Sequence, residues 1–502
     1  MRVVLLRIAT VFLAGFYGLP AYAATYYVDS HTGSNLNSGL APSLAWADLT
    51  PLNQHTFRPG DVIRLHAGQA WTGTIRFHGN GTSLQPITLE AFGEGDRPLV
   101  RGAGADQTLL FKNVSHWNIR GIAVTNHGDE IAKRAGIRIE TNGFVEGIHL
   151  THVRVTDVNG ETGSKSSGGI VVYVSDESDA KAHFDDILID SSVIEHVDGE
   201  GIWIHVNRNQ LQTYLNTNFR VTNTTINDVG RNAMYIRGTL GALIDHNVVS
   251  FAGARKHGNA ICIGWAKNTT VRNNEVFKTG VNTGEHENGA YDVDDGALGT
   301  IVEYNWSHDN VGPSVSAGAL PGRNCDDADT IIRFNLSEND GKNIFVVGGA
   351  IRRTAIYNNT VYVGKHHSGL LVRAGQFTHY SQLPDGIIFT RNAIFNAGKL
   401  QFEWAASGVK AQGNCYFGAA PRGTMHEKDA SFAPGKLDRE GVPIRERAGA
   451  EAYRIPDSSA CAHAVGMIED QGETDFLGAR VSSYPAGGHG AILGSSSATR
   501  RQ

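Results

Sequence analysis

A short run of carboxylates is where this sequence could most readily support chemistry. In the segment Tyr291-Asp292-Val293-Asp294-Asp295, alternation along an extended strand sends Asp292 and Asp294 to the same side. Carboxylates held that close raise the pKa of one of them or attract a cation. The segment therefore predicts either a calcium site formed by Asp292, Asp294 and Asp295 or a catalytic pair of carboxyl groups. Calcium binding or turn stabilisation without catalysis is the structural alternative.

Two phrases repeat at the period of a solenoid coil and would position these carboxylates. In the first phrase, an asparagine precedes a β-prone pair at intervals of 24 to 33 residues. Such a period is typical of stacked repeats, and it predicts an all-β fold, a single-stranded right-handed parallel β-helix. Asparagines at one bend of successive coils can form a hydrogen-bonded ladder. The predicted ladder is Asn223, Asn247, Asn274, Asn305, Asn335, Asn359 and Asn392.

The second phrase is a short alternating strand in phase with the asparagines. Alternate residues of each strand should face the core, and those between them should face solvent. The predicted inward residues are Ile202, Ile204, Met234, Ile236, Ile261, Ile263, Tyr291, Val293, Ile344, Val346, Leu370 and Val372.

Outward residues of stacked strands form columns, with about 4.8 Å between coils. One predicted column is His205, Arg237, Gly264, Asp294, Val347 and Arg373, and the other is Trp203, Tyr235, Cys262, Asp292, Phe345 and Leu371.

These columns and the turns that lead into them supply the other candidate site residues. A face that mixes aromatic, acidic and basic side chains suits a sugar chain, because sugar rings stack on aromatic rings and hydroxyls hydrogen-bond to charged groups. A plain solvated face is the alternative. The predicted catalytic residues are Asp292, Asp294, His205, Arg237, Lys256 and Lys342, and the predicted substrate-binding residues are Trp203, Tyr235, His257 and Arg373.

Composition and the termini bound the class of protein. Residues 1–23 combine Arg2 and Arg7 with an apolar run and then Ala21-Tyr-Ala23, which predicts an export signal cleaved after Ala23 and a secreted or periplasmic protein. We expect an N-terminal cap and first coils in 24–100, the β-helix in 101–405, a last coil and cap in 406–486 and a disordered tail in 487–502. The net charge of −6, without a basic run, argues against nucleic acid as a partner. We expect a monomer with no membrane contact after cleavage.

The four cysteines match no zinc pattern. In an exported chain they permit one or two disulfides, and the sequence leaves the pairing open. They are Cys262, Cys325, Cys415 and Cys461.

Three places near the ends of the chain carry a family resemblance. They are Tyr26-Tyr-Val-Asp-Ser with Asn37-Ser-Gly, Pro59-Gly-Asp-Val-Ile, and Ser458-Ser-Ala-Cys with Asp475-Phe-Leu-Gly. With the coils, they make the chain similar to the bacterial right-handed parallel β-helix proteins of the pectate-lyase-like superfamily. The resemblance implies a polysaccharide as substrate. It leaves the chemistry open, because lyases, hydrolases, epimerases and binding proteins share these motifs. The paired motifs of polygalacturonases are not found in successive coils.

The first functional prediction is a polysaccharide lyase that acts on a uronate-containing polymer. In this reading calcium neutralises the uronate, and Lys256, Lys342, Arg237 or His205 removes the C5 proton. The first alternative is a glycoside hydrolase that uses the paired carboxylates. The second is a non-catalytic glycan-binding or surface protein, and an epimerase would share the proton abstraction of the lyase.

Overall fold

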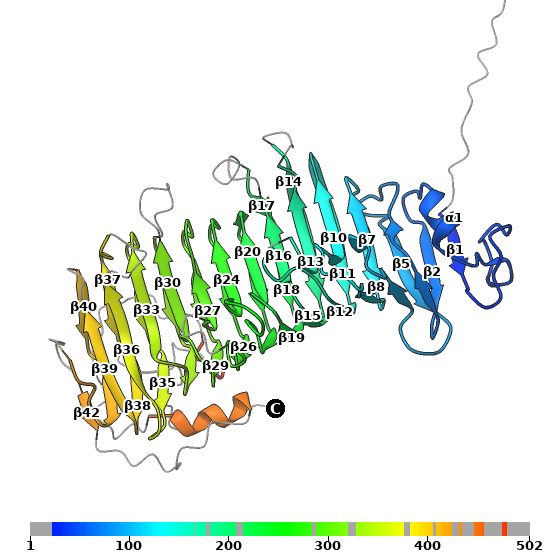
Figure 1. Ribbon diagram of the computed structural model, residues 1–502. Coiled ribbons are helices and arrows are strands. Elements are labelled where there is room, and N and C mark those ends of the chain that lie inside the picture. The colour runs from blue at the N-terminus through cyan, green and yellow to red at the C-terminus, as the bar shows by residue number, and fades with distance from the viewer. Residues whose placement is uncertain are drawn as a thin grey trace, which may run out of the picture.

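The computed structural model is a parallel β-helix, which confirms the predicted all-β solenoid (Figure 1). The structure describes residues 23–164, 166–176, 181–206, 214–283, 288–319, 328–375, 382–404, 408–423, 431–433, 446–455 and 474–478. Most of the predicted export signal, Cys325, Cys461 and the tail after residue 487 lie outside the described residues.

From β2 to β39 each coil contributes one strand to each of three long sheets, apart from the extra short strands β17 and β21, and the paired strands are parallel throughout the described residues. Sheet A contains β1 (Thr25–Val28), β2 (Val62–His66), β5 (Ile87–Phe92), β8 (Trp117–Arg120), β11 (Phe144–Thr151), β14 (His183–Asp190), β17 (Asn216–Thr217), β18 (Arg220–Thr222), β21 (Thr239–Leu240), β22 (Leu243–Asp245), β25 (Thr270–Arg272), β28 (Ile301–Glu303), β31 (Ile331–Arg333), β34 (Ala355–Tyr357), β37 (Ile387–Thr390) and β40 (Val409–Gln412).

Sheet B follows sheet A in each coil. It contains β3 (Ala70–Thr72), β6 (Leu99–Arg101), β9 (Ala123–Asn126), β12 (Arg154–Val158), β15 (Val193–Val197), β19 (Thr225–Val229), β23 (Val248–Ser250), β26 (Glu275–Phe277), β29 (Trp306–His308), β32 (Leu336–Glu338), β35 (Thr360–Val363), β38 (Ala393–Asn396), β41 (Cys415–Gly418) and β42 (Ser431–Ala433).

Sheet C carries the predicted site. It contains β4 (Ile75–Arg76), β7 (Gln107–Lys112), β10 (Ala135–Thr141), β13 (Gly168–Val174), β16 (Glu200–His205), β20 (Met234–Arg237), β24 (Ile261–Gly264), β27 (Tyr291–Val293), β30 (Val315–Ala319), β33 (Asn343–Gly349), β36 (Ser368–Gly375) and β39 (Lys399–Trp404).

Three helices lie at the ends of the described chain. The 3-10 helix η1 (Pro42–Leu44) and α1 (Leu49–Gln54) follow β1, and the carboxylate of Asp48 caps α1 by accepting from the backbone of Thr50. The 3-10 helix η2 (Arg447–Tyr453) belongs to the C-terminal segment. Among the described residues, no helix has the length and the hydropathy that a membrane span requires.

The core is one continuous apolar column inside the three sheets, mainly aliphatic with some aromatic rings. The inward residues predicted from Ile202 to Val293 are all buried in it. Alternation explains this, because each short strand turns one set of β-branched side chains toward the axis and leaves the other set outside.

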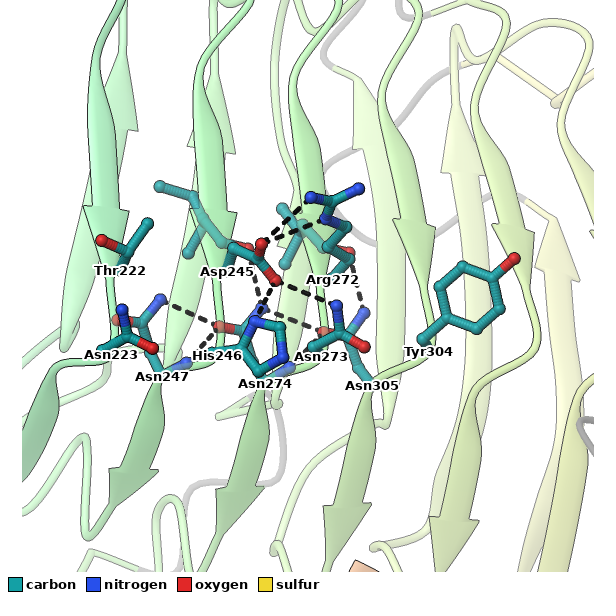
Figure 2. Close-up of polar contacts among 12 residues, drawn as sticks. Thr222, Asn223, Asp245, His246, Asn247, Arg272, Asn273, Asn274, Tyr304 and Asn305 are labelled. Carbon is teal, nitrogen blue, oxygen red and sulfur yellow. Dashed lines mark hydrogen bonds and ion pairs between the residues drawn. The ribbon is translucent and has the colours of Figure 1, made fainter. Parts of the chain in front are cut away.

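The corner between sheets A and B holds the asparagine ladder (Figure 2). Oδ1 of Asn274 accepts both the backbone N–H and the side-chain amide of Asn247, each over 2.9 Å, and Asn274 donates to Asn305 in the same way. The ladder continues through the predicted positions to Asn414, one coil beyond the prediction. It satisfies backbone groups that would otherwise be buried without partners.

The prediction for Asn223 is wrong by one position. The residue before each ladder asparagine has a left-handed backbone, and Asn223, with φ of 51°, occupies that place. The ladder position of its coil is taken by Thr224, whose N–H donates to Oδ1 of Asn247 over 2.9 Å. Asn223 instead donates to Asp190 from outside the corner. Asparagine suits both places, because it tolerates left-handed backbone and hydrogen-bonds well.

The predicted register of sheet C fails after Asp292. Strand β30 pairs Ser316 with Asp292 on one side and with Val346 on the other, so Val346 faces outward and Phe345 is buried in the core. Leu370 is also outside the core, while Leu371 and Val372 are buried in it. Phe345, Val347 and Leu371 therefore leave the predicted outward columns.

The C-terminal segment packs along the outer face of sheet B. Tyr453, Ile455 and Phe476 join a second apolar cluster with side chains of β29, β32, β35, β38 and β41. In Figure 1 the helix of this segment lies beside β29 and β35. The segment thus covers a face of the solenoid as well as following its last coils.

Candidate functional site

The predicted site lies on the outer side of sheet C, where one column of side chains is continuous. Backbone pairing aligns Trp203 with Tyr235, Tyr235 with Cys262, and Cys262 with Asp292. The column therefore aligns Trp203, Tyr235 and Asp292 as predicted, with Ser316 next to Asp292. Trp203 is three coils from Asp292, or about 14 Å along the axis.

Asp292 is held by three hydrogen-bond donors. Its Oδ1 accepts from the hydroxyl of Ser316 over 2.5 Å, and its Oδ2 accepts from the amide of Asn259 over 2.6 Å and from the thiol of Cys262 over 3.5 Å. Burial raises the pKa of Asp292, and these hydrogen bonds oppose the rise while the charge of Asp295 adds to it. The carboxyl group is therefore fixed in place and inclined to hold a proton.

Asn259 was missed by the sequence analysis, and a second ladder fixes its orientation. Its N–H donates to Oδ1 of Asn232, and its own Oδ1 accepts the N–H of Gly289, both over 2.7 Å. Because Oδ1 of Asn259 is the acceptor, its amino group must point at Asp292. A repeated signal was visible: an asparagine precedes alanine at both Asn232 and Asn259, at the start of the strand phrase.

Asp294 lies beside Asp292 on the same outward side. The thiol of Cys262 is 3.9 Å from Oδ2 of Asp294. One ligand atom each from Cys262, Asp292 and Asp294 lies within 4.8 Å of the others. Both carboxylates are partly exposed, whereas Cys262 is buried. The predicted pairing of the two carboxyl groups is therefore present in the geometry.

The donor set of this group differs from the predicted calcium ligands. It contains the sulfur of Cys262, and Asp295, which is buried, is not part of it. Calcium prefers a shell of oxygen ligands, and both oxygens of Asp292 already accept hydrogen bonds. Calcium at Asp292, Asp294 and Asp295 stays a prediction, to be tested by chelation.

Aromatic side chains form the floor of the column. Trp203 and Tyr235 are only 5% and 4% exposed although they point away from the core, and they form a separate apolar cluster with Cys262. Burial, together with the charges of Cys262 and Asp294, raises the pKa of Tyr235 well above its ordinary value. Tyr235 therefore keeps its proton at neutral pH and can donate a hydrogen bond but cannot act as a base.

His205 lies one strand from Tyr235, in a stack of rings. Its ring lies 4.6 Å from that of Tyr173 and nearly parallel to it, and its Nε2 is 2.9 Å from Oδ1 of Asp176. Burial lowers the pKa of His205, and the hydrogen bond to Asp176 opposes this. His205 is therefore inclined to stay neutral. Asp176 was not predicted, because it follows the strand phrase in a connecting loop.

Arg237 is packed against an aromatic ring. It is 7% exposed, and its guanidinium lies 4.3 Å from the centre of the Trp265 ring. Strand pairing places Arg237 opposite Gly264, in the column predicted to contain Asp294.

The remaining predicted residues are not part of the group formed by Cys262, Asp292 and Asp294. Lys256 and His257 are exposed in the turn before β24, and Lys256 reaches toward Gly163. Lys342 is exposed just before β33. Arg373 falls in the column of Asp292 instead of that of Asp294, three coils away, or about 14 Å along the axis, and pairs with Glu403. The column shift follows from β30, whose Val-Ser-Ala-Gly-Ala sequence lacks the aliphatic pattern.

Of the cysteines, Cys262 is a thiol within the site. Cys415 is in a disulfide whose other half lies outside the described residues.

Comparison with known proteins gives one curated relative and several structures of the same fold. No family model matches the chain. A lacto-N-biosidase of Bifidobacterium longum is 24% identical over 92% of this chain and 36% of that protein, so the chain spans about a third of the relative. A GH136 lacto-N-biosidase from Eubacterium ramulus superposes with a TM-score of 0.61 at 16% identity, over 82% of this chain and 68% of that one. XylC in complex with xylose gives 0.54 at 13% identity, over 93% and 98%. The chain is thus similar in sequence to a lacto-N-biosidase and shares a fold with these two structures.

Proposed function

We propose that this protein is a glycoside hydrolase that uses Asp292 and Asp294 as its catalytic pair. The observation that carries the proposal is their geometry: an oxygen of each carboxylate lies within 4.8 Å of the other, and burial raises the pKa of Asp292. Carboxyl groups about 5 Å apart serve retaining glycosidases, whereas inverting enzymes need roughly 6.5 Å or more to admit a water molecule. The pair therefore favours a retaining mechanism.

The two carboxyl groups take different roles. Asp292, with its raised pKa, is the general acid. Since Asn259 must donate to Oδ2, the proton of Asp292 resides on Oδ1, beside Ser316. Asp294 attacks the anomeric carbon while Asp292 gives its proton to the leaving oxygen. Asp292 then takes a proton from the water that releases the sugar from Asp294.

The surroundings of the pair favour a neutral glycan. Asp294 and Asp295 lie near Asp292 and add negative charge that would repel a uronate. The 24% identity to a lacto-N-biosidase over 92% of the chain supports a hydrolase that acts on such glycans. Trp203 and Tyr235 are buried beneath the column, so they form its apolar floor and leave little ring surface for a sugar to stack on.

A polysaccharide lyase is the second candidate. His205 favours it, because burial lowers its pKa and leaves a neutral imidazole that can take a proton, with the cation Arg237 in the next coil. Asp292 and Asp294 lie three coils from His205, or about 14 Å along the axis, and these carboxylates would need a cation before a uronate could bind. A glycan-binding protein without turnover is the third possibility.

Product analysis separates these candidates. Mature protein is incubated with neutral oligosaccharides, including lacto-N-tetraose, and with alginate and pectate, with and without chelator. The hydrolase gives new reducing ends from a neutral glycan, and both Asp292→Asn and Asp294→Asn abolish them. Asp157→Asn is the matched control, because that carboxylate is exposed on sheet B. Ultraviolet-absorbing unsaturated ends from a uronate polymer would show a lyase instead, and chelator sensitivity would support calcium. If no glycan gives either kind of product, both enzyme proposals are contradicted.

A further inference from the structure

A second polar groove lies on sheet A, away from the carboxylate pair on sheet C. It has a volume of about 590 Å³, and its wall includes Thr82, Ser83 and Pro86. Its floor crosses β8, β11, β14 and β18. The side chains on the floor include Asn118, Glu146, His149, Asp185, Asp186 and Arg220. A groove of this size is in the range of small-ligand sites.

Asp186 is held rigidly on the floor of the groove. Nε2 of His149 lies 2.8 Å from one of its oxygens, and Nη2 of Arg220 donates to the other over 2.6 Å. Burial would raise the pKa of Asp186, but these two partners outweigh it and lower the pKa. Asp186 therefore stays charged, and its orientation is set before any ligand arrives.

The neighbouring carboxylates are held in the same manner. Oδ1 of Asp185 accepts from Thr217 over 2.6 Å and from Asn218 over 2.7 Å. Oε1 of Glu146 is 3.0 Å from Nε2 of His116. These partners come from other coils, so the positions of the carboxylates are fixed by the stacking of the solenoid.

The backbone of the groove makes room for these side chains. Gly147 has φ of 69°, and a Cβ there would lie 2.6 Å from Nδ1 of His116. Asp186, in the next coil, also has a left-handed backbone, with φ of 55°. Left-handed backbone at a residue other than glycine persists only where the surroundings hold it, as the two partners of Asp186 do.

The charges of the groove select the chemical class of its ligand. Three carboxylates face one guanidinium and two imidazoles, so an anionic uronate, sulfate or phosphate is repelled. Fixed carboxylate and amide oxygens accept hydrogen bonds from hydroxyl groups, and such bonds to charged acceptors are strong. We propose that the sheet A groove is a second glycan-binding site, which takes a neutral sugar unit. This second proposal depends on the proposed function only in the choice of a neutral glycan as the ligand.

Calorimetric titration tests this proposal without turnover. The background is the full mature chain carrying Asp294→Asn, and the probes are lacto-N-tetraose, cellohexaose and xylohexaose, with tetragalacturonate as the acidic counterpart. Two groove variants are compared in this background: His149→Ala with Asp185→Ala, which removes polar groups, and Asn118→Trp, which fills the groove and keeps the ion pairs. The matched control is His127→Ala with Asp157→Ala, which removes an exposed ion pair on sheet B.

We expect a neutral oligosaccharide to bind the background and the control with the same affinities. In both groove variants, binding at one of the two sites should be lost or weakened at least tenfold. Equal binding by a groove variant with unchanged melting temperature would overturn the proposal. So would tighter binding of tetragalacturonate, or no saturable binding of any neutral probe. Product analysis of each titrated sample shows whether the background cleaves the probe, so failure of the proposed hydrolysis and failure of the groove are told apart.

Discussion

The side-chain amide of Asn259 donates to Oδ2 of Asp292 over 2.6 Å, and a ladder of backbone contacts prevents it from turning away. This donor stabilises the charged form of Asp292 and so opposes the effect of burial on its pKa.

Asn259→Ala should therefore raise the pKa of Asp292 further. A hydrogen bond to a charged acceptor contributes about 1.5–3 kcal/mol, which corresponds to roughly one pH unit or more. In a retaining hydrolase the alkaline limb of kcat/KM reports the general acid, so this limb should move upward by about that amount. Asn232→Ala is the control, because it removes one bond of the same ladder without contacting Asp292. An unmoved alkaline limb in Asn259→Ala would count against Asp292 as the acid.

Replacing Asp292 by asparagine should stabilise the protein while abolishing turnover. A carboxyl group with a raised pKa weakens the fold above that pKa, where a buried charge must be carried. The penalty disappears as the pH falls toward the ordinary value of 3.8. Melting temperatures of Asp292→Asn and wild type should therefore differ most at about pH 7.5 and converge in acid. A lower melting temperature of the variant at neutral pH would contradict this reading.

Asp340 provides the matched comparison for this effect. It is 2% exposed between Ser307, Ser337 and Asn310, and burial raises its pKa as well. Asp340→Asn should stabilise the protein with the same pH dependence and leave the activity near that of wild type. Loss of activity in Asp340→Asn would show that this comparison does not separate the effect of Asp292 on stability from its role in catalysis.

His308 should stabilise the fold in a defined pH window. Burial would lower its pKa, but hydrogen bonds to Asp309 and Glu275 outweigh burial and raise the pKa from 6.5 to about 9. The protonated form therefore stabilises the fold fully below pH 6.5, and the stabilisation is lost as the pH rises through 9. The shift corresponds to at most about 3 kcal/mol. His308→Gln should lower the melting temperature at about pH 6 and much less at about pH 10; a constant difference would show that protonation is not involved.

Two tyrosines of the second apolar cluster, Tyr453 of the C-terminal segment and Tyr362 of β35, should respond differently to loss of the hydroxyl. The hydroxyl of Tyr453 donates to the buried carboxylate of Glu338 over 2.5 Å, whereas that of Tyr362 has no hydrogen-bond partner among the described residues. Tyr453→Phe should cost about 1–3 kcal/mol of unfolding free energy, and Tyr362→Phe less than about 0.5 kcal/mol. Denaturant unfolding of both variants measures the difference, and equal costs would argue against anchoring through Glu338.

The repeats allowed most of the fold to be predicted, because successive coils bury the same alternating pattern of side chains. The column from Trp203 to Asp292 was correct where aliphatic residues alternate in every strand. It failed at β30, because Ala317 and Ala319 fill core positions that the pattern reserved for larger side chains. Small residues fit there, but they carry little periodic signal.

The partners of the candidate site were harder to predict than its carboxylates. Asp176 reaches His205 from a connecting loop, and Ser316 reaches Asp292 from the coil that the pattern missed. Such contacts depend on how coils stack, which spacing within one coil does not determine. The ionic turn residues Lys256 and Lys342 were placed near the pair only by their position in the repeat, and the structure leaves them exposed.

Azide rescue of two variants tests the assignment of Asp292 and Asp294 most directly. Mature Asp294→Ala and Asp292→Ala proteins are incubated with azide and an activated glycoside of the neutral glycan that wild type cleaves, and NMR identifies the anomer of each product. We predict a glycosyl azide of inverted configuration from Asp294→Ala, where azide replaces the nucleophile, and one of retained configuration from Asp292→Ala, where azide attacks the glycosyl ester. An inverted sugar as the first product of wild type, or no glycosyl azide from either variant, would contradict the account.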